Sequence, residues 1–176
     1  MTTTPSDSDV LAPLRDGIDI FERSPAHPDS ARLLDAFHAE QVGRYGFADP
    51  VDLSPGDYAP PQGAFVVLYR DTRAAGCGGY RWYDRSAGTV EIKKVYVDPA
   101  SRGLGTGRAL LTWLERHAAA AGARRAILET GVRNTAALRL FDAAGYQPVE
   151  RYVAGRNPEI NRAFARSLIP PPDRSV

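Results

Sequence analysis

The sequence of 176 residues has only one cysteine and three histidines. A single cysteine, Cys77, excludes an internal disulfide, which suits a reducing compartment, so we expect a cytoplasmic protein. Cys77 could be a nucleophile, but a lone cysteine in a strand is more typical of a buried hydrophobic position. His27, His38 and His117 lack the spacing of metal ligands, and no metal site is expected.

Long hydrophobic runs and a net charge of either sign are also missing. No apolar run approaches the roughly 20 residues that a membrane span needs. The formal net charge is +1, which gives no reason to expect nucleic acid or a membrane surface as a partner. Residues 1–16 are polar and acidic and predict a disordered leader, not a secretory signal. Residues 17–170 are expected to form one domain, as a monomer or a homodimer.

The most informative segment is a glycine-rich loop between a predicted strand and a predicted helix. Gly103, Gly105 and Gly107 follow the extended Val97-Asp98-Pro99 and precede an amphipathic helix. Glycine lets the backbone approach a ligand closely, and the free N–H groups of a helix N-terminus bind anions. The segment therefore predicts a binding site for a diphosphate.

Two common diphosphate motifs do not fit this loop. The dinucleotide pattern G-x-G-x-x-G needs a glycine at its sixth position. That position is Arg108 when the pattern starts at Gly103 and Leu110 when it starts at Gly105. The P-loop pattern needs Lys and then Ser or Thr after its last glycine, but Gly107 is followed by Arg108 and Ala109. The pattern that remains is Arg102-x-x-Gly105-x-Gly107. A glycine-rich turn that only begins a helix is the alternative, so the flanking segments must decide.

The flanks predict a regular alternation of strands and helices. Residues 89–97 are β-branched and aromatic, as in a strand. Apolar residues at helical spacing follow the loop until Gly122, and residues 126–130 form a second apolar strand. Asn134 then caps a further helix that ends at Gly145.

In this order, residues 64–149 resemble the core of the GNAT superfamily of acyl-CoA-dependent N-acyltransferases. The resemblance implies an α/β (α+β) fold: a mixed, mostly antiparallel sheet flanked by helices and splayed where the cofactor enters. It also implies acetyl-CoA as the cosubstrate.

The resemblance assigns the coenzyme A site residue by residue. The pyrophosphate is expected on the backbone N–H groups of residues 104–108, with the Arg102 and Arg108 side chains as charge partners. The pantetheine arm is expected beside residues 95–97, where a backbone N–H would also stabilise the oxyanion. Asn134 matches a family asparagine and is equally well explained as a plain helix cap. The residues assigned to the cofactor are Val95, Tyr96, Val97, Arg102, Gly103, Leu104, Gly105, Thr106, Gly107, Arg108, Asn134 and Phe141.

Glu91 is the predicted general base, on the strand that leads into the loop. By the two-residue period of a strand, it shares a face with Lys93, Val95 and Val97. Burial among apolar neighbours would raise the pKa of Glu91 toward neutrality, which suits a base. The alternatives are a salt bridge with Lys93 or a cross-strand arginine, and catalysis through a chain of waters.

The general acid is where the sequence departs from the family. Many relatives place a tyrosine near the sulfur, but alignment from Asn134 puts Phe141 there, without a hydroxyl. Tyr152 is the predicted substitute, with Tyr146 or solvent as alternatives. Tyr146 also fits a core position of the family.

The predicted function is direct transfer of an acetyl group from acetyl-CoA to a primary amine, most simply that of a small molecule. A protein or peptide acceptor is one alternative, and a non-catalytic coenzyme A sensor is another. The acceptor site is expected between the 45–62 loop and the segment after Tyr146. Its available polar residues are Tyr45, Asp57, Tyr58, Glu129, Tyr152 and Asn157.

Overall fold

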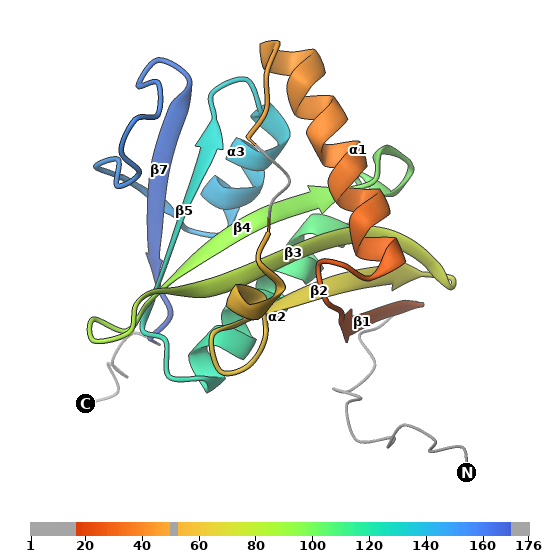
Figure 1. The fold of residues 1–176 in the computed structure, drawn as a ribbon, viewed down its shortest axis with the longest axis horizontal. Helices are drawn as coiled ribbons and strands as arrows, with labels where there is room; N and C mark the ends of the chain where they lie inside the picture. Colours follow the sequence, from red (N-terminus) through yellow and green to blue (C-terminus); the bar gives the residue numbers. More distant parts are fainter. Residues whose placement is uncertain (1–16, 50–52, 170–176) are drawn as a thin grey trace, which may run out of the picture.

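A computed structural model describes residues 17–49 and 53–169; the predicted leader, residues 1–16, lies outside the described residues. One seven-stranded sheet, in the order β1-β2-β3-β4-β5-β7-β6, runs through the fold (Figure 1). Its strands are β1 (Ile18–Glu22), β2 (Gly63–Arg70), β3 (Arg73–Asp84), β4 (Thr89–Val97), β5 (Arg125–Gly131), β6 (Gln147–Val149) and β7 (Asn161–Ser167). The helices are α1 (Pro28–Tyr45), α2 (Thr106–Ala120) and α3 (Thr135–Ala143), with 3-10 turns η1 (Pro55–Tyr58) and η2 (Pro99–Ser101).

The predicted mixed, mostly antiparallel sheet is confirmed, and its one parallel pair determines where a ligand can enter. β4 and β5 pair only over Thr89–Glu91 and Arg125–Ile127. Beyond these residues the two strands separate, as Figure 1 shows, while β5 stays paired with β7 on its other side. The second half of β4 and the end of β5 therefore face each other across a gap, each with an unpaired backbone edge.

Helices cover both faces of the sheet. α2 and α3 contribute Leu110, Leu114 and Phe141 to the larger hydrophobic core, together with residues from β2, β3, β4 and β5. α1 and η1 cover the opposite face through a second core that contains Leu33 and Tyr58. α1 begins two or three residues earlier than the sequence indicated, because His27 and not Asp29 or Ser30 is its N-cap.

β4 contains a bulge that changes which side chains share a face. Lys94 has a φ of 58°, and the pairing of β3 with β4 shifts between Cys77 and Gly79. Glu91 and Lys93 face α1, but after the bulge Val95 and Val97 lie on the α2 face, where they approach Gly78 and Gly107. The expected common face of Glu91, Lys93, Val95 and Val97 is therefore wrong, because one extra residue interrupts the strand's alternation.

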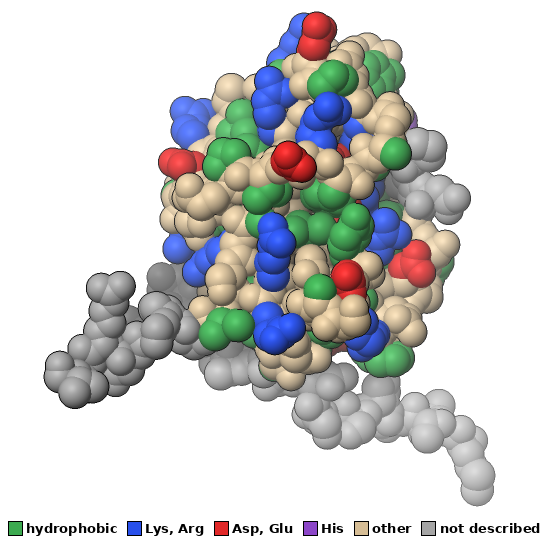
Figure 2. Space-filling view, turned by 90° about the vertical axis from the view of Figure 1, so that its left-hand side faces the viewer, with side chains coloured by type: hydrophobic (Ala, Val, Ile, Leu, Met, Phe, Trp, Pro, Cys, Tyr) green, Lys and Arg blue, Asp and Glu red, His purple; other side chains and the backbone are tan. Residues whose placement is uncertain are grey.

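No helix in residues 17–49 and 53–169 is long and apolar enough to cross a membrane. On the face shown in Figure 2, basic, acidic and hydrophobic side chains are interspersed.

Candidate active site

The glycine-rich loop has the geometry of an anion-binding helix start. Gly103 and Gly105 have φ values of 74° and 78°, a left-handed conformation that other residues rarely adopt. Gly105 is the N-cap of α2 and supplies no side-chain cap, so the first N–H groups of α2, from Thr106 onward, lack an intrahelical acceptor. These groups and the helix dipole favour a bound phosphate at this end of α2.

Two polar side chains hold the loop in this shape. Arg70, at the end of β2, donates from Nε to Thr106 Oγ1 at 3.0 Å and from Nη2 to the Leu104 carbonyl at 2.6 Å. Thr106 is buried and donates its hydroxyl to the Ser101 carbonyl at 3.0 Å. Sequence reasoning did not identify Arg70, because it lies 36 residues before Thr106 in the chain.

The two arginines assigned to the pyrophosphate make other contacts in this structure. Arg102 Nε donates to the Val97 carbonyl at 3.0 Å, and its Nη2 pairs with Glu40 of α1 at 2.5 Å. Arg108 Nη1 donates to the Ala143 carbonyl, at the end of α3, at 2.8 Å. Both guanidinium groups therefore brace the loop against neighbouring helices, and the backbone N–H groups are the part of the loop left for the ligand.

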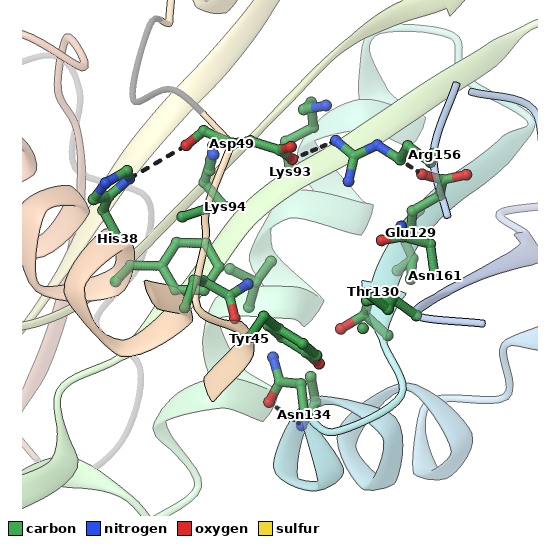
Figure 3. A pocket seen from close by; sticks show the side chains of 18 of the residues that line it. His38, Tyr45, Asp49, Lys93, Lys94, Glu129, Thr130, Asn134, Arg156 and Asn161 are labelled. Carbon is green, nitrogen blue, oxygen red and sulfur yellow. Dashed lines mark hydrogen bonds and ion pairs between the residues drawn. The ribbon is translucent and has the colours of Figure 1, made fainter. Parts of the chain in front are cut away.

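A cavity of about 420 Å³ opens where β4 and β5 separate (Figure 3). Val95, Asn134 and Phe141, assigned to the cofactor, all line it. Asn134 accepts a hydrogen bond from the Ala137 N–H at 3.3 Å, so its role as helix cap is confirmed. Tyr96 points away, toward the α1 core, where it packs on Phe37 with ring centroids 5.5 Å apart.

Unpaired strand edges border this cavity on both sides. Backbone N–H and C=O groups on such edges are open to an extended polar chain, which can complete the sheet through hydrogen bonds. The pantetheine arm of coenzyme A is such a chain, since it carries two amides. The gap therefore fits the arm, and the glycine-rich loop at the end of β4 fits the pyrophosphate.

Glu91 lies at the closed end of the gap, and its surroundings are charged. Its side chain is 4% exposed. Its Oε2 pairs with Arg81 of β3 at 3.1 Å, and its Oε1 pairs with Lys93 at 3.4 Å. The two salt bridges offered as the alternative to a catalytic role are thus both present. The apolar neighbours expected around Glu91 are replaced by two cations and a tyrosine.

That tyrosine is Tyr152, so the two predicted catalytic residues are in direct contact. The Tyr152 hydroxyl donates to Glu91 Oε1 at 3.2 Å. Burial and the nearby Glu91 and Glu129 raise the pKa of Tyr152, which keeps the phenol protonated. Tyr146, the alternative acid, is 2% exposed in the core beside Phe141. Among the described tyrosines, Tyr45 is the one that lines the cavity, at the end of α1.

Glu129 of β5 is a buried carboxylate in the lining of the cavity. Its side chain is 5% exposed, and neither oxygen has a hydrogen-bond partner in the described part of the chain. Arg156 Nε lies 3.2 Å from Oε2 as an ion pair. Burial raises the pKa of Glu129, against the opposing effects of Arg156 and of the Val153 backbone N–H. The sequence offered Glu129 only as a polar group of the acceptor site.

Other residues considered from the sequence fall inside or outside this cavity. Asn157 lines the cavity. Asp57 lies outside the cavity and pairs with Arg81 at 3.5 Å. Tyr58 also lies outside the cavity, in the core beneath α1, where it is 4% exposed. Cys77 is completely buried, and burial raises the pKa of its thiol to about 12. A thiolate nucleophile at Cys77 is therefore not supported.

Comparison with known proteins agrees with this geometry. Residues 30–146 match the Acetyltransferase (GNAT) family. The IAA acetyltransferase of Azospirillum brasilense is 36% identical over 134 residues, which are 73% of this chain and 84% of that protein.

Solved structures give the same fold. An inferred acyl-CoA N-acyltransferase from Klebsiella pneumoniae has a TM-score of 0.73 and 25% identity, over 86% of this chain and 98% of the other. An acetyltransferase from Salmonella typhimurium, solved with acetyl-CoA, has a TM-score of 0.65 and 21% identity, over 88% and 95% of the two chains. The chain belongs to the GNAT family of acetyltransferases. It is an acyltransferase that uses acetyl-CoA as its cosubstrate.

Proposed function

We propose that this acetyltransferase acetylates the primary amine of a small molecule, with Glu129 as the group that accepts the amine proton. The observation that carries the proposal is the buried Glu129 carboxylate, without a hydrogen-bond partner among the described residues, in the cavity at the β4–β5 gap. The loop at residues 102–108 would hold the pyrophosphate, and Val95, Val97 and Asn134 would border the pantetheine arm.

The reaction requires one bond exchange and two proton movements. The amine nitrogen forms a bond to the thioester carbonyl carbon, and the carbon–sulfur bond then breaks to release the thiolate. The nitrogen loses one proton to the Glu129 carboxylate. The thiolate gains one proton, from solvent or from Tyr152, the donor predicted from the sequence, which donates to Glu91 and is not among the residues that line the cavity. A backbone N–H of β4 beyond the bulge would stabilise the oxyanion.

Glu129 suits the role of base better than Glu91 for a geometric reason. The Glu91 carboxylate already forms ion pairs with Arg81 and Lys93 and accepts a hydrogen bond from Tyr152. A base must instead have a free lone pair, and neither Glu129 oxygen has a hydrogen-bond partner among the described residues. We assign to Glu91 the positioning of Tyr152 and Lys93 at the closed end of the gap.

The size and closure of the cavity favour a small acceptor over a peptide. The volume of about 420 Å³ is within the range for small-molecule sites, and the pantetheine arm would take up part of it. Tyr45 and Phe47 from the end of α1 and Arg156 from the segment before β7 line it from opposite sides. These segments leave less room for an extended peptide than an open groove would. A cytoplasmic location and a monomeric or homodimeric state remain proposals from the sequence.

The experiment is acetyl-CoA turnover over a broad panel of amines, followed by release of free thiol. The proposal expects turnover with small primary amines and no acetyl group retained on the protein after acetyl-CoA alone. Turnover only with peptides would favour the peptide alternative. Tight binding of coenzyme A without turnover of any amine would favour the sensor.

A further inference from the structure

Lys94 is held in the active-site cavity by an unusual backbone conformation. It is the bulged residue of β4, and its φ of 58° is rare for a residue with a side chain. Its side chain lines the cavity, with Nζ 5.7 Å from the centre of the Phe37 ring. Strain of this kind persists where the surrounding structure enforces it, often at functional sites.

The other cations of the cavity already have acidic partners. Lys93 pairs with Glu91, and Arg156 contacts both Asp49 and Glu129 (Figure 3). Within residues 17–49 and 53–169, no acidic group lies within ion-pair distance of Lys94 Nζ, and no acceptor lies within hydrogen-bond distance.

Lys94 is partly buried, and its ammonium group loses part of its hydration in the cavity. Burial lowers the pKa of Lys94, partly offset by Asp49. An anionic group of a ligand bound in the cavity would replace the lost hydration and give this ammonium group a partner. Lys94 and Glu129 thus give one cavity two charged groups of opposite sign, placed on the two strands that border the gap.

We propose that the acceptor is an amino carboxylic acid, whose amine approaches Glu129 while its carboxylate pairs with Lys94. This inference rests on the proposed function and narrows its substrate class. A polyamine fits less well, because its second ammonium would meet Lys94. A peptide N-terminus fits less well too, since its own carboxyl carbon is part of an amide and carries no charge.

The test compares matched acceptors. Each amino acid of the panel is assayed beside its primary amide and its decarboxylated amine, which keep the reacting nitrogen and remove the negative charge. A charge-assisted contact predicts that kcat/KM for the acid exceeds that of both neutral analogues by about 10- to 100-fold. Equal or lower kcat/KM for the acids would overturn the inference and leave the acetyltransferase function standing. No turnover of any amine would overturn both.

Variants at Lys94 separate recognition from a loss of folding. Lys94→Gln removes the charge and should reduce the acid-to-amide ratio of kcat/KM toward one, while Lys94→Arg should largely keep it. Thermal unfolding of both variants near the wild-type temperature shows that they are folded. Arg116→Gln, at an exposed position of α2, is the matched control for loss of one positive charge. An unchanged ratio in Lys94→Gln would contradict the assignment.

Discussion

Arg70 donates from Nη2 to the carbonyl of Leu104 at 2.6 Å and so ties the end of β2 to the coenzyme A loop. Its Nε binds Thr106 Oγ1 at the first residue of α2. One guanidinium therefore fixes both the loop and the helix start whose N–H groups would bind the pyrophosphate. The loop is shaped before the cofactor arrives, which lowers the entropy that binding must overcome.

Replacing Arg70 should weaken acetyl-CoA binding. Arg70→Met keeps much of the side-chain volume but removes both hydrogen bonds, so the loop loses its support. We expect the dissociation constant for coenzyme A, measured by calorimetry, to rise about tenfold, equivalent to about 1.4 kcal/mol. The exposed Arg116→Met is the matched control and should bind normally. Normal binding by Arg70→Met would show that the glycine backbone alone shapes the loop.

Gly105 tests the loop assignment itself. Gly105→Val forces a β-branched residue into a left-handed conformation and places methyl groups beside the N–H groups of α2. We expect coenzyme A binding to fall at least about 100-fold, while the protein loses about 1–2 kcal/mol of stability from the backbone strain.

Gly122, after the far end of α2, provides the matched control. Its φ is 98°, so Gly122→Val carries a comparable strain at a distance from the loop. Thermal unfolding should show similar destabilisation of both variants, and calorimetry should show loss of binding only for Gly105→Val. Equal binding by the two variants would mean that the pyrophosphate lies elsewhere.

The pH dependence of stability should differ in sign between two glutamates. The raised pKa of Glu129 means that the folded state binds its proton more tightly than the unfolded state does. Its contribution to stability is then greatest in acid and is lost as the pH rises through the folded pKa. Glu129→Gln should therefore melt at a higher temperature than the wild type at pH 7, and this difference should shrink toward pH 4.5.

Glu40 provides the opposite case. Burial acts to raise its pKa, but hydrogen bonds from Arg102 and Arg44 outweigh burial and lower it. Its stabilising contribution is present above the unfolded pKa and is lost as the pH falls through the folded pKa. Glu40→Gln should melt below the wild type at pH 7, with the difference again shrinking in acid. If both variants melted above the wild type at pH 7, or both below it, the described environments of Glu129 and Glu40 would be contradicted.

The sequence was sufficient to predict the features that depend on local chemistry. The glycines at 103 and 105, the Asn134 cap and the apolar periodicity of α2 each act over a few residues, so the order of strands, loop and helices could be inferred. Glycine spacing and the family resemblance together predicted a diphosphate site at this loop. Gly122 likewise follows the end of α2 with a left-handed φ, as predicted.

The sequence could not predict features that depend on distant segments. The bulge at Lys94 needs the register of β3 against β4, and without it the side chains of Val95 and Val97 were assigned to the wrong face. The environment of Glu91 depends on Arg81 and Tyr152, which lie 10 and 61 residues away in the chain. Glu129 was one of several polar candidates for the acceptor site, because its burial and its contacts also depend on segments far away in the chain.

The identity of the base is the most direct test of the proposed mechanism. The kcat/KM of Glu129→Gln and Glu91→Gln should be measured from pH 5 to pH 9 with an amine that the wild type acetylates. Loss of a general base costs typically about 10²–10⁴-fold, so Glu129→Gln should lose this much and also the fall in rate at acid pH that the wild type shows. Glu91→Gln should lose less than tenfold and keep the wild-type pH profile. A large loss in Glu91→Gln beside near-normal activity in Glu129→Gln would contradict the account and return the role of base to Glu91.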